Sequence, residues 1–274
     1  MIVKHLYPLM FSIFIIAMGA FNSLITEEEY TDWVYNHNSK IRVILSEVKE
    51  DFLFIGLNIS LLEDSYTYWK NPGDMGVKTK IEITDKYRNI SNYEINWPAP
   101  ELYRDQNGIS YIYRDEVIIP ILIKPLNVDE SMDISIQINY GVCNKICVPI
   151  NENLSLKLDY IKNNLKKSSP LIDNALLNIP IRRNDNHKII SNASLIEDGR
   201  VRYIEIDFKE PINQIFTYNE HGYILTDAEE YKLKYDNYLY RFEDEDRGSG
   251  LYNKPIEALI ITEKGSFIED FIIQ

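Results

Sequence analysis

A period-two alternation of apolar and polar residues limits most strongly what this chain of 274 residues can fold into. In residues 132–140, MDISIQINY, every second residue is apolar and the residues between them are polar. Successive side chains of a β-strand point to opposite faces of the sheet, so this pattern predicts a strand that is buried on one face. The same alternation predicts strands at residues 40–48, 52–61, 77–84 and 154–160.

Short turn signals separate these segments. They include NPGD at 71–74, WPAP at 97–100 and DQNG at 105–108. Such clusters favour tight turns because proline fixes φ and glycine accepts a positive φ. Several short strands separated by turns are typical of a β-sandwich, so we predict an all-β fold.

The pattern changes after Tyr160, where residues 162–169 are mainly polar and basic. Ser169 and Pro170 then form a helix start, apolar residues follow at helical spacing, and Pro180 ends the helix. A short helix is therefore expected in the connection between two β-rich parts. Strand-like segments return at 200–208, 214–218, 231–242, 256–262 and 266–273.

These changes divide the chain into a first β-sandwich over residues 28–161 and a second β-rich domain over 162–274. At the start of the chain, a short basic stretch and an uncharged run at 6–20 form the pattern of a secretory signal peptide over 1–22. Because the uncharged stretch continues to Ile25, an uncleaved membrane anchor is the alternative. In either case we expect a periplasmic protein, and only an uncleaved segment would hold it at the membrane.

The composition excludes some classes of function. A hydrophobic content of 45% and a charged content of 26% are those of a folded protein. The formal net charge of −13 argues against nucleic-acid binding, which needs a basic surface to displace counterions from phosphates. The same charge argues against adhesion to anionic lipid head groups. No nucleic-acid partner is therefore expected.

The only two cysteines, Cys143 and Cys147, lie in the segment YGVCNKICVP at 140–149. Outside the cytoplasm such a pair can persist as a disulfide. As a structural bridge it would stabilise the fold by only about 2 kcal/mol, because the ring that it closes is short. Domains of this size fold without cross-links, and short rings are more easily reduced. Both points favour a redox role.

A metal site is a third interpretation of the pair. Thiolates suit Cu(I), and Cys-x3-Cys followed by a proline resembles the copper-binding loop of the Sco copper chaperones. In that family the pair opens a helix and a distant histidine completes the site, whereas strand-like residues follow the pair here. The spacing alone leaves a redox couple, a structural bridge and a Cu(I) site open.

Four blocks occur in order along the first half: YTYWKNPGDMG at 66–76, NWPAP at 96–100, YRDEVIIP at 113–120 and YGVCNKICVP at 140–149. Together they resemble the periplasmic N-terminal region of the thiol:disulfide interchange proteins DsbD and ScsB, over roughly residues 33–160. Three residues between the cysteines are closer to the ScsB-like form than to DsbD itself. Ile112 stands where the family usually has a glycine.

The resemblance implies two tandem immunoglobulin-like β-sandwiches. It implies that Cys143 and Cys147 are the redox couple of a thiol:disulfide oxidoreductase component, with no cofactor and no metal ligands. The couple would take electrons from a polytopic membrane thiol-relay protein and pass them to thioredoxin-like periplasmic proteins. Full-length family members carry a membrane domain and a thioredoxin-like end, and neither occurs before Gln274. A separately encoded membrane partner is therefore expected, and which cysteine attacks stays open.

In the DsbD branch an aromatic cap loop shields the cysteine pair, and the matching stretch here is 102–113. A nearby charge shifts the balance between thiol and thiolate, so charged neighbours of the pair are candidate modulators. Ordinary packing is the alternative for each aromatic candidate, and a non-catalytic binding or assembly module with a structural disulfide is the alternative for the whole protein. The shielding candidates are Tyr103, Tyr111 and Tyr113, and the candidate modulators are Asp115 and Lys145.

Overall fold

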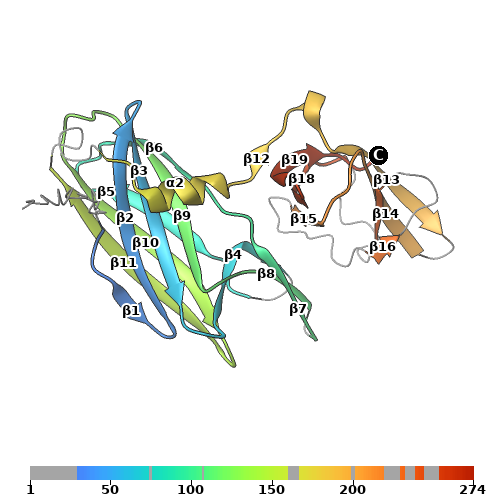
Figure 1. The fold of residues 1–274 in the computed structure, drawn as a ribbon, viewed down its shortest axis with the longest axis horizontal. Helices are drawn as coiled ribbons and strands as arrows, with labels where there is room; N and C mark the ends of the chain where they lie inside the picture. Colours follow the sequence, from blue (N-terminus) through green and yellow to red (C-terminus); the bar gives the residue numbers. More distant parts are fainter. Residues whose placement is uncertain are drawn as a thin grey trace, which may run out of the picture.

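The computed structural model of this chain describes residues 30–73, 76–106, 108–159, 167–198, 201–218, 229–231, 238–243 and 253–274. The predicted signal or anchor segment lies outside these residues. The described residues form two β-sandwiches joined by a short α-helix (Figure 1). This confirms the predicted all-β class with two tandem immunoglobulin-like sandwiches and a helix in the connection. Within the described residues, no helix has the length and apolar character needed to span a membrane.

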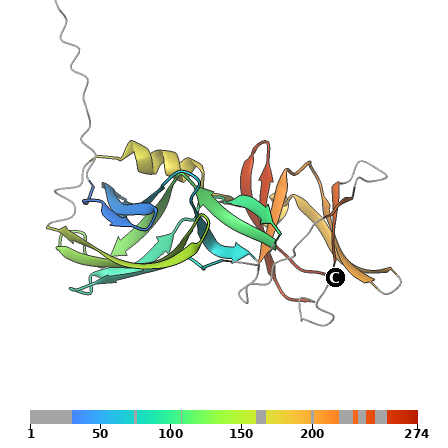
Figure 2. The ribbon, with the colours of Figure 1, turned by 90° about the horizontal axis from the view of Figure 1, so that it is seen from below.

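The first sandwich consists of two sheets whose neighbouring strands are antiparallel (Figure 2). One sheet has the order β1 (Val34–Asn36), β2 (Ser39–Lys49), β3 (Phe52–Leu61), β9 (Glu116–Pro125) and β6 (Ile90–Ile95). The other has the order β11 (Cys147–Leu158), β10 (Met132–Cys143), β4 (Tyr66–Gly73), β8 (Gly108–Arg114) and β7 (Glu101–Asp105), and β5 (Lys80–Asp85) also pairs with β10.

The alternation read from the sequence explains how the two sheets close on each other. On β10, Ile134, Ile136 and Ile138 are fully buried, whereas Gln137 between them is exposed. Burying one such side chain stabilises the fold by about 1.5–3 kcal/mol. The inner faces of β2, β3 and β9 supply the opposite half of this core with further branched aliphatic residues.

The helix α2 (Pro170–Leu177) packs on the outer face of β3 and β9 (Figure 1). Its buried residues include Ile172, and a Cβ on Gly56 of β3 would lie 3.0 Å from the Ile172 side chain. The missing side chain therefore lets the helix approach the sheet. Ser169 occupies the N-cap position as predicted, but its side chain makes no capping hydrogen bond; its backbone N–H donates to Ser46 Oγ at 3.0 Å instead.

The second sandwich also has two sheets, and it includes the short 3-10 helix η1 (Asp185–His187). One sheet has the order β12 (Ile181–Arg182), β19 (Gly265–Phe271), β18 (Ile256–Thr262) and β15 (Gln214–Tyr218). The other has the order β13 (Ile190–Asp198), β14 (Val201–Phe208), β17 (Tyr238–Glu243) and β16 (Glu229–Tyr231).

Strand β18 has buried apolar residues on both of its faces. Ala258 and Ile260 of β18 face the core of the second sandwich, whereas Leu259 belongs to the core cluster of the first. Phe216 of β15 lies opposite Leu259 in the ladder and joins the same cluster. The second sandwich therefore packs on the first through β15 and β18.

Candidate redox site

The two cysteines form a disulfide at the tip of the β10–β11 hairpin. Cys143 is the last residue of β10, Cys147 is the first residue of β11, and the two are directly opposite each other in the ladder. Their sulfurs are 2.03 Å apart. Both strands are 12 residues long and pair from Met132↔Leu158 to this end. The ladder already holds the hairpin closed, so the disulfide adds little to the structure of this turn.

The two cysteines differ in their access to solvent. Cys143 is 0% exposed and belongs to a small buried cluster with Tyr68 of β4 and Ile112 of β8, which we call the redox cluster. Cys147 is exposed, as is Ile146 beside it, which is 65% exposed. A partner protein can therefore approach the pair from the side of Cys147.

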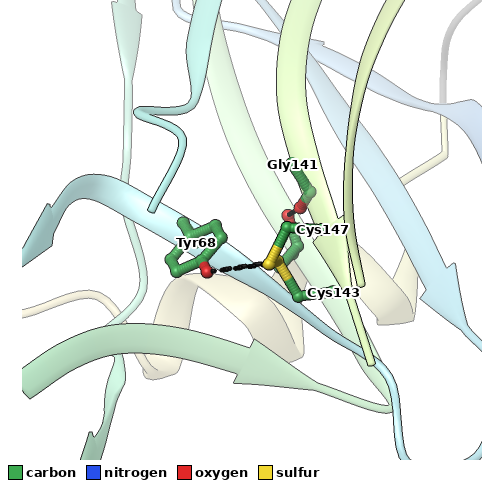
Figure 3. The surroundings of a disulfide bond; sticks show 5 residues. Tyr68, Gly141, Cys143 and Cys147 are labelled. Atoms are coloured by element: carbon green, nitrogen blue, oxygen red, sulfur yellow. Dashed lines mark hydrogen bonds between the residues drawn. A yellow bond between two sulfur atoms is a disulfide. The ribbon is translucent and has the colours of Figure 1, made fainter. Parts of the chain in front are cut away.

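Tyr68 presents its hydroxyl to the disulfide (Figure 3). The phenol oxygen lies 3.1 Å from Cys143 Sγ and 3.5 Å from Cys147 Sγ. Two glycines make room for the ring: a Cβ on Gly76 would lie 2.3 Å from Tyr68 Cε1, and a Cβ on Gly141 would lie 3.3 Å from Tyr68 Cδ2. No larger residue fits at Gly76 with the ring in this position.

The electrostatics keep the Tyr68 phenol protonated. Burial raises the pKa of Tyr68 well above its ordinary value, and the neighbouring Tyr66 and Asp105 shift the pKa in the same direction. A protonated phenol donates its hydrogen bond to sulfur. This bond becomes charge-assisted and stronger when the disulfide opens and a thiolate forms.

A second row of side chains lies behind Tyr68. The ring of Tyr66 packs edge-on against Tyr68 with centroids 5.6 Å apart, and Tyr103 of β7 lies 5.2 Å from Tyr66. The guanidinium of Arg114 sits 5.5 Å from the Tyr66 ring and 5.2 Å from the Tyr103 ring, and 3.6 Å from Glu101. This row joins the β7–β8 hairpin to the redox cluster.

The three tyrosines predicted to shield the cysteine pair lie in two different places in the structure. Tyr103 packs against the redox cluster. Tyr111 instead faces the sandwich interior, where its ring lies 4.7 Å from Phe216 and 6.1 Å from Trp69. Tyr113 is also in the interior, where burial raises the pKa of its phenol, and its hydroxyl donates to the Pro98 carbonyl oxygen at 2.8 Å.

The predicted modulators also lie in different places. Lys145 is exposed in the loop between the two cysteines. Asp115 lies in the turn between β8 and β9 with a φ of 55°, and its carbonyl oxygen accepts the Leu61 N–H at 2.7 Å. Sequence reasoning missed Asp105 and, above all, Tyr68. The signal was present, because Tyr66 and Tyr68 stand two residues apart on a strand and so share one face.

Comparisons with known proteins found a matching family model and solved structures of similar fold. Residues 40–159 match the family model described as thiol:disulfide interchange protein DsbD, N-terminal. The N-terminal periplasmic domain of ScsB from Proteus mirabilis matches 90% of this chain and 98% of that chain, with 19% identity and a TM-score of 0.64. The reduced N-terminal domain of Neisseria meningitidis DsbD covers 43% of this chain and 85% of that chain, with 14% identity and a TM-score of 0.29. A comparison with curated protein sequences found no match.

An immunoglobulin-like sandwich with a cysteine pair at a hairpin tip, one cysteine exposed and the other buried beside a phenol, together with the family match, supports a thiol–disulfide interchange module. The family match makes the class specific. Residues 40–159 match the model of the DsbD N-terminal region, and the ScsB domain shares the fold, so the predicted resemblance to this region is confirmed.

Proposed function

We propose that this protein carries reducing equivalents outside the cytoplasm, from a membrane thiol-relay protein to thioredoxin-like proteins, through Cys143 and Cys147. The observation that carries the proposal is the asymmetry of the pair. Cys147 is exposed, whereas Cys143 is buried with its sulfur 3.1 Å from a hydrogen-bond donor. A structural bridge needs neither an accessible sulfur nor a donor for a leaving thiolate.

The first half of the proposed cycle reduces the disulfide. A thiolate of the membrane partner attacks Cys147 Sγ, the S–S bond breaks, and Cys143 leaves as a thiolate that accepts the hydrogen bond of Tyr68. The second thiolate of the partner then attacks the partner's own sulfur in the mixed disulfide. The Cys147 thiolate is released, the partner becomes a disulfide, and two electrons have passed to the cysteine pair.

The second half returns the pair to the disulfide. The Cys147 thiolate attacks one sulfur of a disulfide in the thioredoxin-like client, and the other client sulfur leaves as a thiolate that takes a proton from water. The Cys143 thiolate then attacks Cys147 Sγ in the mixed disulfide and releases the second client thiolate. The client has gained two electrons, and the Cys143–Cys147 bond is restored.

The periplasm is the compartment that fits this chemistry. A disulfide of this kind persists in an oxidising compartment and not in the cytosol. The ScsB domain that shares the fold is itself described as periplasmic. The predicted signal segment at 1–22 supplies the route across the membrane in this proposal.

Mixed-disulfide trapping with purified oxidised thioredoxin tests the assignment of the two sulfurs. Cys143→Ser keeps the exposed thiol and removes the resolving one, so it accumulates a mixed disulfide with the probe. Cys147→Ser keeps only the buried thiol and accumulates far less, and the double serine variant is the blank. Equal trapping by the two single variants contradicts the assigned roles, and no trapping by either contradicts exchange itself.

A further inference from the structure

We infer that the second sandwich positions the redox site of the first: Phe216, Tyr218 and Glu257 hold strand β4 so that Tyr68 stays against the disulfide. This inference rests on the proposed function, because it concerns the chemistry of the same cysteine pair. It assigns to the second sandwich a role in setting the stability of the thiolate.

The pairing of β4 breaks just after Tyr68. The ladder with β8 runs through Thr67↔Tyr113 and Tyr68↔Ile112, and the next pair is Gly73↔Ser110. The residues between Tyr68 and Gly73 therefore bulge out of the ladder with β8. The strand that carries the donor to sulfur loses its regular β8 pairing at the next residue, so other contacts must fix its path.

Aromatic side chains of the second sandwich contact the start of this bulge. The ring of Trp69 packs edge-on against Tyr218 with centroids 5.1 Å apart, and it lies 6.5 Å from Phe216. Trp69 is 1% exposed and Phe216 is 0% exposed. Edge-to-face contacts at this spacing are favourable beyond the area that they bury.

A polar cluster continues the contact at the next residue of β4. Lys70 Nζ lies 3.5 Å from Glu257 Oε1 and 4.7 Å from the centre of the Tyr218 ring. The carboxylate of Glu257 also accepts hydrogen bonds from Arg182 of β12 and from the Tyr218 hydroxyl. Two strands of the second sandwich, β15 and β18, thus contact the ammonium of one β4 residue, and Arg182 of β12 holds Glu257 in place.

Adjacent residues link this contact to the sulfur. Neighbours on a strand point to opposite faces, so Tyr68 faces the disulfide while Trp69 faces the second sandwich. The same division occurs on β8, where Ile112 belongs to the redox cluster and Tyr111 packs on Phe216. Phe216 therefore contacts both β4, which pairs with β10 at Cys143, and the next strand of the sheet, β8. A shift of Trp69 moves Tyr68.

The test measures the lower apparent thiol pKa of the fully reduced protein from the ultraviolet absorbance of the thiolate. Tyr68→Phe is expected to raise this pKa by about one to two units. Phe216→Ala is expected to raise it too, by a smaller amount. Phe216→Leu keeps most of the packing and restores a value near that of the unchanged protein. Phe271→Ala is the matched control, because Phe271 lies in the separate core of the second sandwich. It destabilises that sandwich but leaves the thiol pKa unchanged.

A double-mutant cycle makes the result specific. Once Tyr68 has lost its hydroxyl, Phe216→Ala has nothing left to displace, so Tyr68→Phe with Phe216→Ala gives the same thiol pKa as Tyr68→Phe alone. Full additivity of the two shifts, or a Phe216→Ala shift no larger than that of Phe271→Ala, overturns the inference. If Phe216→Ala does not fold, Glu257→Gln, which removes the charge that holds Lys70, is measured in its place with the same criteria.

The failure of this inference is distinguishable from failure of the proposed function. The thiol pKa is measured on the isolated reduced protein and needs no partner. If Cys143→Ser still traps oxidised thioredoxin while Phe216→Ala leaves the pKa unchanged, only the role of the second sandwich is wrong. If the pKa shifts as expected but no trapping occurs, exchange is wrong and the structural coupling stands.

Discussion

Replacing Tyr68 by phenylalanine tests the hydrogen bond between the Tyr68 hydroxyl and Cys143 Sγ. The substitution removes only the hydroxyl that lies 3.1 Å from Cys143 Sγ, and the ring keeps its seat beside Gly76 and Gly141. In the oxidised protein the sulfur is a weak acceptor, so the free energy of unfolding changes by less than about 1 kcal/mol. The main effect is therefore expected in the reduced protein.

The expected size follows from the charge on the acceptor. A hydrogen bond to an ionised group contributes about 1.5–3 kcal/mol, and one pKa unit corresponds to about 1.4 kcal/mol. Tyr68→Phe therefore raises the lower apparent thiol pKa of the pair by about one to two units. The same loss destabilises the reduced form at a pH above both thiol pKa values. The reduction potential measured there falls by about 30–60 mV, because 30 mV corresponds to about 1.4 kcal/mol for two electrons.

The assay is a pH titration of thiolate absorbance in the reduced protein, paired with the potential in glutathione buffers at two pH values. At a pH below both thiol pKa values no thiolate is present in either protein, so the potentials of the two proteins coincide there. An unchanged or lowered thiol pKa in Tyr68→Phe refutes the assignment of Tyr68 as the donor. A potential that shifts equally at both pH values refutes the role of the thiolate.

Three further outcomes follow from other parts of the structure. Gly76→Ala lowers the melting temperature and raises the thiol pKa, because the new Cβ clashes with the Tyr68 ring. Gly265→Ala is the control for backbone strain: Gly265 has a similar φ of 131°, but its new Cβ would have its nearest neighbour at 3.9 Å. In Glu257, burial raises the pKa but is outweighed by the hydrogen bonds from Tyr218 and Arg182 and by the charge of Lys70, so the pKa lies below its ordinary 4.5. The stability that this lowered pKa contributes is present above pH 4.5 and is lost as the pH falls through the folded-state pKa. In thermal unfolding scans, Glu257→Gln therefore removes this contribution to the fall in melting temperature at acid pH. The carboxylate of the fully buried Glu269 accepts two backbone N–H bonds, at 2.6 Å and 3.0 Å, so Glu269→Ala destabilises the protein in urea unfolding by about 1.5–3 kcal/mol or more and leaves the thiol pKa unchanged. If Gly265→Ala raises the thiol pKa as much as Gly76→Ala does, contact with the Tyr68 ring is not the cause. If the acid dependence survives in Glu257→Gln, Glu257 is not its source. If Glu269→Ala leaves the free energy of unfolding unchanged, the two backbone hydrogen bonds do not stabilise the fold.

Strands with one solvent-exposed face are the easiest to predict from the alternation of apolar and polar residues. The alternation in residues 132–140 predicts β10, and the structure extends this strand to Cys143. Pro149 lies within β11, and a proline is tolerated there because β11 is the edge strand of its sheet. β8 has five consecutive buried residues, Ile109–Tyr113, so alternation does not reveal it.

The site was less predictable than the fold because it depends on which face of a strand each residue occupies. Tyr103 and Tyr111 are both aromatic residues of the expected cap stretch, yet only Tyr103 packs against the redox cluster. A shift of one residue in register moves a side chain to the other face, and the sequence does not give that register. The contact between Tyr68 and Cys143 joins residues 75 positions apart, so it requires the folded sheet.

The reduction potential of the Cys143–Cys147 disulfide, read by thiol trapping in glutathione buffers near neutral pH, distinguishes a redox couple from a structural bridge. Exchange with thioredoxin-like proteins requires a potential within reach of theirs, so we predict a value above about −300 mV together with two-electron transfer to oxidised thioredoxin. A value below about −300 mV with no transfer identifies a structural bridge and rules out the proposed exchange.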